Sequence, residues 1–235
     1  MATPITTRGT GMDNAALYRL MAWLSPSYPV GAFAYSHGIE WAVEDGRVTG
    51  EAALAAWAES IVRHGSGWSD AVLFAHAHAC AGEVSRLAEV NDFAIALTPS
   101  AERHLETTAQ GTAFVKATKD AWPWPDMEAG IEALGSKVAY PVAVAMAASA
   151  HGIPLAAALN AYLHGFAANL VSAGVRLIPL GQSAGQRVLA GLENAITETA
   201  AAAENASFDD VGGIAVTSDI AAMQHETQYT RLFRS

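Results

Sequence analysis

The sequence has 235 residues and a mass of 24.5 kDa, and 51% of its residues are hydrophobic whereas only 15% are charged. This composition is too apolar for a disordered chain, and no linker-like run divides it, so we expect a single domain over residues 1–235. The net charge of −10, from 23 acidic and 13 basic residues, would repel phosphate backbones and anionic lipid surfaces. We therefore expect neither nucleic acid nor a membrane as a partner.

The cysteine content and the N-terminus bear on the compartment. The single cysteine, Cys80, excludes an internal disulfide bond. No basic segment followed by an apolar one begins the sequence, so we expect no secretory signal and predict a cytoplasmic location. Residues 1–11 contain threonine, proline and glycine without periodicity, which predicts a flexible N-terminus.

The first predicted helix follows Asp13, a good N-cap residue, and must stop before Pro26. The next stretch, residues 25–46, is rich in proline, glycine and aromatic residues, which predicts a rigid loop. Ser36 is a plausible cap for a short helix that carries Glu40.

Three further helices are predicted to begin at Thr49, Ser69 and Ser100, since each side chain can accept a hydrogen bond from a first helical turn. The helix after Ser100 has an acidic residue in its first turn and lysines in its last, the order that the helix dipole favours. The run Trp-Pro-Trp-Pro at 122–125 predicts a stiff break after it.

His76, His78 and Cys80 invite a metal-site interpretation. Residues two apart lie on nearly opposite faces of a helix, so the two histidines cannot share an ion, whereas His76 and Cys80 could. Two ligands do not make a structural site, and a core cysteine with hydrogen-bonded histidines is the competing interpretation. We predict no metal site.

Residues 138–175 contain no acidic or basic residue, a length sufficient to span a bilayer. Proline, histidine and asparagine interrupt the run, for example at Pro141, His151 and Asn160, and no Lys/Arg cluster flanks both ends. These features favour a deeply buried pair of helices in a soluble protein.

The chain is organised around residues 154–205, where apolar residues recur at steps of three and four on both sides of Pro179. Proline disfavours helix at the residue before it, so two helices joined by a turn are expected. We predict an all-α, single-domain bundle of about ten helices with this buried helical hairpin at its centre. Gln182 and Gln186 start its second helix and share one face, where a partner could bind.

An enzyme interpretation rests on Gly-x-Ser-x-Gly around Ser183, the nucleophile elbow of esterases. The acid and the histidine could follow as Asp209 or Asp210 and His225. The elbow requires a strand before the serine inside a parallel sheet, and the sequence offers helical periodicity instead. A serine esterase-like hydrolase therefore stays the alternative, and we predict no catalytic residue.

The last twelve residues, 224–235, combine apolar, aromatic and basic side chains on an acidic chain. Tyrosine, arginine and large apolar groups dominate binding energy at protein interfaces. We predict that this tail binds a partner, with Tyr229 and Phe233 as apolar anchors and with Arg231 and Arg234 pairing acidic groups.

Four segments of the sequence resemble the UreF family of urease accessory proteins. The family's loop Ser-Pro-x-(Tyr/Phe)-Pro-x-Gly-x-(Phe/Tyr), followed by Ser-x-Gly-(Leu/Ile)-Glu, matches residues 25–40, and its Glu-x3-Glu…Gln-Gly-x-x-Phe segment matches residues 102–114. Its Arg/Lys-Leu-(Val/Ile)-Pro-Leu-Gly-Gln run matches residues 176–182, and its Met-x-His-Glu-x-x-Tyr-x-Arg-Leu-Phe-x-Ser tail matches residues 223–235. Gln224 stands where the family has a basic residue.

This resemblance implies a non-enzymatic chaperone with no resident cofactor, although nickel could be handled transiently. Such proteins bridge a UreD/UreH-type scaffold accessory protein on apo-urease and a nickel-carrying UreG-type GTPase, often as a homodimer, assist nickel insertion and influence the GTPase. The predicted partner-binding residues are Tyr229, Arg231, Leu232, Phe233, Arg234, His225, Gln182, Gln186, Glu40 and His37.

Overall fold

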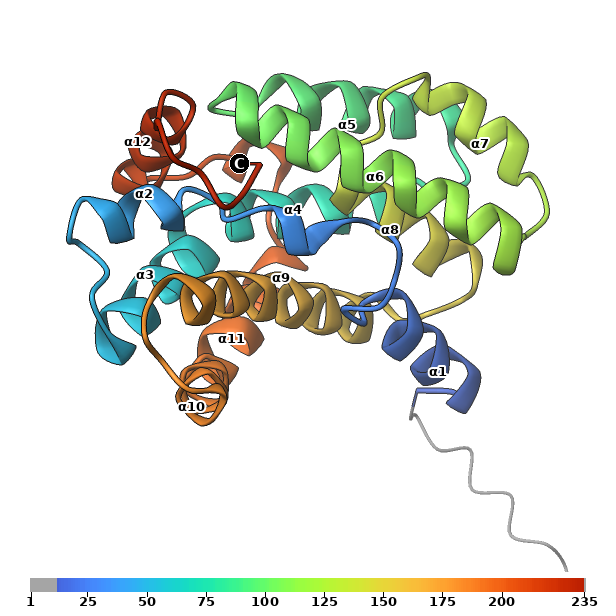
Figure 1. The fold of residues 1–235 in the computed structure, drawn as a ribbon. Coiled ribbons are helices and arrows are strands. Elements are labelled where there is room, and N and C mark those ends of the chain that lie inside the picture. Colours follow the sequence, from blue (N-terminus) through green and yellow to red (C-terminus); the bar gives the residue numbers. More distant parts are fainter. Residues whose placement is uncertain (1–11, 235) are drawn as a thin grey trace, which may run out of the picture.

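The computed structural model describes residues 12–234, and all regular structure in that range is helical, which confirms the all-α prediction (Figure 1). The predicted flexible N-terminus, residues 1–11, lies outside the described residues. The helices are α1 (Asn14–Trp23), η1 (Ala32–Ala34), α2 (Ile39–Glu44), α3 (Glu51–His64), α4 (Ser66–Ala79), α5 (Val84–Ala96), α6 (Ala101–Ala121), α7 (Met127–Leu134), α8 (Tyr140–Ala150), α9 (Leu155–Leu177), α10 (Gln182–Gly191), α11 (Glu193–Ala203), η2 (Phe208–Asp210) and α12 (Val216–His225).

Two of the predicted caps are confirmed. Asp13 accepts a hydrogen bond from the amide of Ala15 in α1, and Ser100 accepts one from the amide of Arg103 in α6. Helix α6 ends at Ala121, directly before the predicted Trp-Pro-Trp-Pro break.

The other three predicted caps are wrong. Glycine takes the N-cap position before α2, α3 and α4, in place of Ser36, Thr49 and Ser69. Ser69 lies inside α4, because the bend between α3 and α4 needs close contact rather than a capping side chain: a Cβ at Gly67 would lie 2.7 Å from the Cα of Val62.

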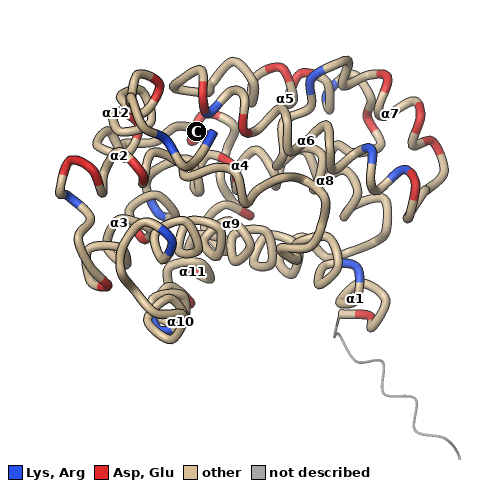
Figure 2. Tube along the Cα trace, viewed as in Figure 1, with Lys and Arg blue, Asp and Glu red and all other residues tan. Residues whose placement is uncertain are grey.

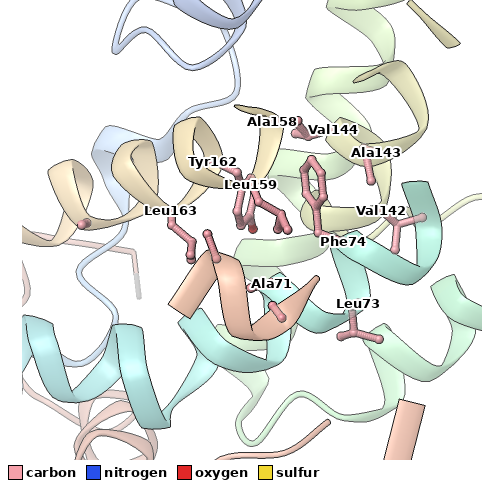
Figure 3. Close-up of a cluster of buried hydrophobic side chains, with 14 of the residues drawn as sticks. Ala71, Leu73, Phe74, Val142, Ala143, Val144, Ala158, Leu159, Tyr162 and Leu163 are labelled. Atoms are coloured by element: carbon pink, nitrogen blue, oxygen red, sulfur yellow. The ribbon is translucent and has the colours of Figure 1, made fainter. Parts of the chain in front are cut away.

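The core lies where α4, α8 and α9 meet (Figure 3). The ring of Phe74 in α4 packs on that of Tyr162 in α9, with 5.3 Å between centroids. Small residues let backbones approach: a Cβ at Gly111 of α6 would lie 2.0 Å from the carbonyl oxygen of Val138, just before α8. The contact at Gly111 is thus a backbone-to-backbone contact.

The charge-free run 138–175 forms the end of the loop before α8, all of α8 and most of α9, in the middle of the molecule (Figures 1 and 2). No helix within residues 12–234 combines the length and the apolar character needed to cross a bilayer. Helix α9 buries nine residues, and α10 follows it after a turn at residues 178–181. Helix α10 is less buried, with only Ala184, Gly185 and Val188 covered.

Candidate functional site

The site is built where α2, α6 and α12 meet the last residues of the chain. His225, the final residue of α12, is fully buried between two carboxylates from different helices. Its Nδ1 lies 2.7 Å from Oε2 of Glu102, in the first turn of α6, and its Nε2 lies 3.0 Å from Oε2 of Glu40, in α2. Both ring nitrogens therefore face oxygen acceptors.

The charge of His225 follows from these contacts. Burial opposes the imidazolium, but the hydrogen bonds that the ring donates to Glu102 and Glu40 outweigh it, and the net effect raises the pKa of His225 above its ordinary value of 6.5. A ring that donates from both nitrogens is doubly protonated. In that form, the site is a cation held between two anions.

The loop before α2 places Glu40 through two residues with positive φ. His37 has φ 58° and Gly38 has φ 76°. At Gly38, a Cβ would also lie 2.6 Å from the backbone nitrogen of Ala222 in α12. The chain can enter α2 this close to α12 only with glycine, which explains the Gly in the Ser-His-Gly-Ile-Glu motif.

The C-terminal tail follows α12 and returns beside α2 (Figure 1), where it is hydrogen-bonded to the same carboxylates. The backbone amides of Leu232 and Phe233 donate to the two oxygens of Glu40, at 2.6 and 2.9 Å, and Arg231 donates to Oε1 of Glu102 at 3.1 Å. The amide of Arg234 donates to the carbonyl oxygen of Ala34 at 2.8 Å. Two acidic side chains thus bind both the end of α12 and the tail that follows it.

Arg176 joins this site to the turn after α9, a contact that sequence reasoning missed. Its guanidinium lies over the ring of Phe33 at 3.6 Å and over that of Phe233 at 4.2 Å. It also donates to the carbonyl oxygen of Phe33. Three of the four motif segments meet here, and the only signal in the sequence was that Arg176 opens the motif at residues 176–182.

A second buried cluster lies one turn further along α6. Glu106 receives hydrogen bonds from Arg103 and Gln110, and its Oε2 lies 3.3 Å from Nδ1 of His37, whose Nε2 lies 2.6 Å from the hydroxyl of Ser66. Burial would raise the pKa of Glu106, but Arg103 and His37 outweigh it and lower that pKa to about 2. Burial, aided by Arg103, lowers the pKa of His37. The two site histidines are therefore shifted in opposite directions.

Cavities border this second cluster. A polar cavity of about 30 Å³ is lined by Asp70, His37 and Glu106, and a larger one of about 320 Å³ opens between α4, α5 and α6. Burial raises the pKa of Asp70 to about 6, although Tyr162 donates to its Oδ2 at 2.8 Å. A buried carboxyl with a single hydrogen-bonding partner is thus held close to its point of titration at neutral pH.

The structure brings together only part of the predicted partner-binding set. Glu40, His225, Arg231 and Phe233 share the first cluster, and Phe233 is only 4% exposed. Three other predicted residues are bonded within or beside this site; these are His37, Leu232 and Arg234. Phe233 and Arg231 therefore already contact their own chain.

The remaining predicted residues lie in water. Tyr229 is fully exposed, at 103% of its reference area. Gln182 and Gln186 are exposed on α10, which lies along the lower side of the molecule in Figure 1, away from α12 at the upper left. The predicted set thus divides into a buried cluster, an exposed tail and a separate exposed pair.

The esterase and metal interpretations find no support within residues 12–234. That range contains no strand to carry a nucleophile elbow, and both ring nitrogens of His225 are bonded to glutamates. His76 and His78 bond to the carbonyl oxygens of Ala206 and Ile153. No group of three or more His, Cys, Asp or Glu side chains in the described range could hold a metal ion.

Comparison with known proteins identifies the family. The UreF family model matches residues 48–193. A protein of Rhodopseudomonas palustris (strain BisB5) named urease accessory protein UreF is 50% identical over 225 residues, covering 95% of this chain and 93% of the relative. A protein of Bradyrhizobium sp. (strain BTAi1) with the same name is 52% identical over 228 residues, covering 96% and 95%.

These relatives are named as accessory proteins, and the family is not catalytic, so this chain is not an enzyme. Family match, full-length relatives, helical fold and all four motifs agree. The chain belongs to the UreF family of urease accessory proteins.

Proposed function

We propose that this chain is an adaptor in urease maturation, which joins a UreD/UreH-type scaffold accessory protein on apo-urease to a nickel-carrying UreG-type GTPase. Nickel is the cargo of the assembly, and the chain contributes binding surfaces rather than chemistry. Family membership supports this role, and the resemblance to UreF proteins supports the named partners and a homodimer of adaptor–scaffold pairs within the complex.

The observation that carries the proposal is the exposed apolar surface of α12 and the tail that follows it. Val216, Ile220 and Met223 are exposed at steps of four and three, so they share one face of α12. Tyr229 and Leu232 continue the exposed apolar segment into the tail, at 103% and 67%. These side chains are not buried when the chain folds alone, so a partner that covers them stabilises the complex by burying them.

We assign this surface to the scaffold protein. The tail's backbone is bonded to Glu40, so its exposed side chains are presented on a fixed segment. A preorganised segment loses less conformational entropy on binding than a free one, which favours a stable partner contact. The GTPase is assigned to the separate exposed pair, Gln182 and Gln186, on α10.

A double variant, Tyr229→Ser with Leu232→Ser, tests the assignment. Loss of a tyrosine anchor commonly costs about 2 kcal/mol, so we expect at least about a 30-fold rise in the Kd for the scaffold accessory protein. Circular dichroism should be unchanged, because both side chains are exposed. The control is Tyr18→Ser on α1, another exposed tyrosine, at 68%.

Point variants are sharper than truncation here. Deleting residues 224–235 would also remove His225 and Phe233, which are buried in the chain's own site. If the double variant and the Tyr18 control bind the scaffold protein equally well, the tail side chains are not the docking surface.

A further inference from the structure

The two carboxylates that bind the tail also bind the buried histidine from which the tail starts. His225 is 0% exposed, and its contacts to Glu40 and Glu102 bridge α12 to α2 and to α6. The tail's contacts use the same two glutamates. Helix α12 and the tail therefore share one attachment point.

With a doubly protonated ring, the charges of this attachment balance. Glu40 and Glu102 supply two negative charges, and His225 and Arg231 supply two positive ones. A neutral ring keeps one N–H and presents a lone pair from its other nitrogen. One glutamate oxygen would then face that lone pair at 2.7 or 3.0 Å with no proton between them.

We propose that His225 is a proton-dependent latch: its doubly protonated ring fastens α12 and the following tail to α2 and α6, and loss of one proton weakens that attachment. The partner-binding face would accordingly be presented in one arrangement below pH 6.5 and loosened as the pH rises above that value. This inference concerns the isolated chain and does not depend on which protein binds the tail.

The direction in which docking of α12 and the tail depends on pH follows from proton linkage. A histidine whose pKa is raised in the docked state binds a proton on docking, so its contribution is complete below its free value of 6.5 and is lost as the pH rises through the docked value. Between those two values, the equilibrium constant for docking falls by up to tenfold per pH unit.

Other charged groups lie on every element that packs around His225. They are His37 before α2, Arg103 and Glu106 on α6, Asp219 on α12, Glu226 directly after it, and Arg231 in the tail. Glu226 accepts a hydrogen bond from the amide of Ala101 at the start of α6, so it strengthens the same attachment.

His37 and Asp219 are among these neighbours with shifted pKa values. The pKa of His37 is lowered by burial, so its contribution changes below 6.5. The pKa of Asp219 is raised by burial above its ordinary value of 3.8. A change above pH 6.5 is therefore assigned to His225 only where it shares the midpoint of the His225 ring itself.

Nuclear magnetic resonance of the wild-type chain between pH 6 and 9 tests the latch without any substitution. We expect the His225 ring to titrate above 6.5, and the amide protection factors of Leu232 and Phe233 to fall with the same midpoint. Three results would overturn the proposal: a ring midpoint at or below 6.5, no titration up to pH 9, or titration with unchanged protection of both amides.

Three variants extend the test. Glu102→Gln removes one carboxylate and should lower the midpoint, whereas His225→Lys keeps a positive charge and should keep the two tail amides protected up to pH 9. The matched control is His164→Gln, an exposed histidine on α9, which should leave the midpoint unchanged. Tail protection that still falls at the wild-type midpoint in His225→Lys would show that another group controls the tail.

Discussion

Gly38 offers a sharp test of how α2 meets α12, because the chain contains a matched control. Gly38 and Gly31 have nearly the same backbone conformation, φ 76° and 75°, and lie in the same loop region. A Cβ at Gly31 would meet no atom within 4 Å, whereas one at Gly38 would lie 2.6 Å from the nitrogen of Ala222. Substituting alanine at both positions separates the cost of the left-handed conformation from the cost of the contact.

The expected magnitudes follow from these two costs. The left-handed conformation costs an alanine about 1–2 kcal/mol, which both variants incur. Ordinary contacts begin at 3.4 Å, so Gly38→Ala must also separate two backbones by about 3.4 − 2.6 = 0.8 Å. Overpacking of this kind costs about 1–3 kcal/mol more. We expect Gly31→Ala to lose about 1–2 kcal/mol and Gly38→Ala about 2–5 kcal/mol.

The assay is urea unfolding of both variants, combined with hydrogen exchange at the amides of Leu232 and Phe233. Helix α12 lies close to the end of the chain, so it can detach before the rest unfolds, and detachment limits the global loss. Gly38→Ala should therefore lose protection at both amides, while Gly31→Ala keeps it. Equal destabilisation and equal protection in the two variants would refute the close contact between α2 and α12.

Three more outcomes are expected. Ser183→Ala should change the free energy of unfolding by less than about 0.5 kcal/mol, because the exposed serine makes no capping bond to α10. Neither the wild type nor the variant should hydrolyse esters, and hydrolysis that is lost in the variant would restore the esterase alternative. Replacing Gln182 and Gln186 with alanine should leave thermal unfolding unchanged and weaken recruitment of the UreG-type GTPase in a pull-down, and unaltered recruitment would make the pair merely structural. Asp70→Asn should stabilise the chain by up to about 3 kcal/mol at pH 7 and should have no such effect below pH 3.8. The reason is that the pKa of Asp70 rises from 3.8 to about 6 on folding, so the wild-type chain loses stability as the pH rises between those two values. Urea titrations that give the same difference between variant and wild type at pH 3.5 and at pH 7 would contradict this.

Local sequence rules determined most of the helix inventory. Asp13 and Ser100 begin helices because their side chains accept amide hydrogen bonds within three residues, and Pro179 separates α9 from α10 because it cannot continue a helix. These effects act over a few residues, so the sequence alone reveals them. The same short reach explains the failure at Ser69, because α4 begins after Gly65, where a Cβ would lie 2.9 Å from the Cβ of the distant Ala215. The failure at Thr49 has no such cause, since a Cβ at Gly50 would meet no atom within 4 Å.

Only the tertiary structure decided the site. His225 lies 123 residues from Glu102 and 185 from Glu40, and no local pattern connects them. The motifs pointed to Glu40 and to the tail, but as surfaces for a partner; the fold instead turns Phe233 inward beneath Arg176 and leaves Tyr229 outside. Which side chain is covered depends on how α2, α6 and α12 pack, and the two carboxylates that this packing brings to His225 favour its charged form against the effect of burial.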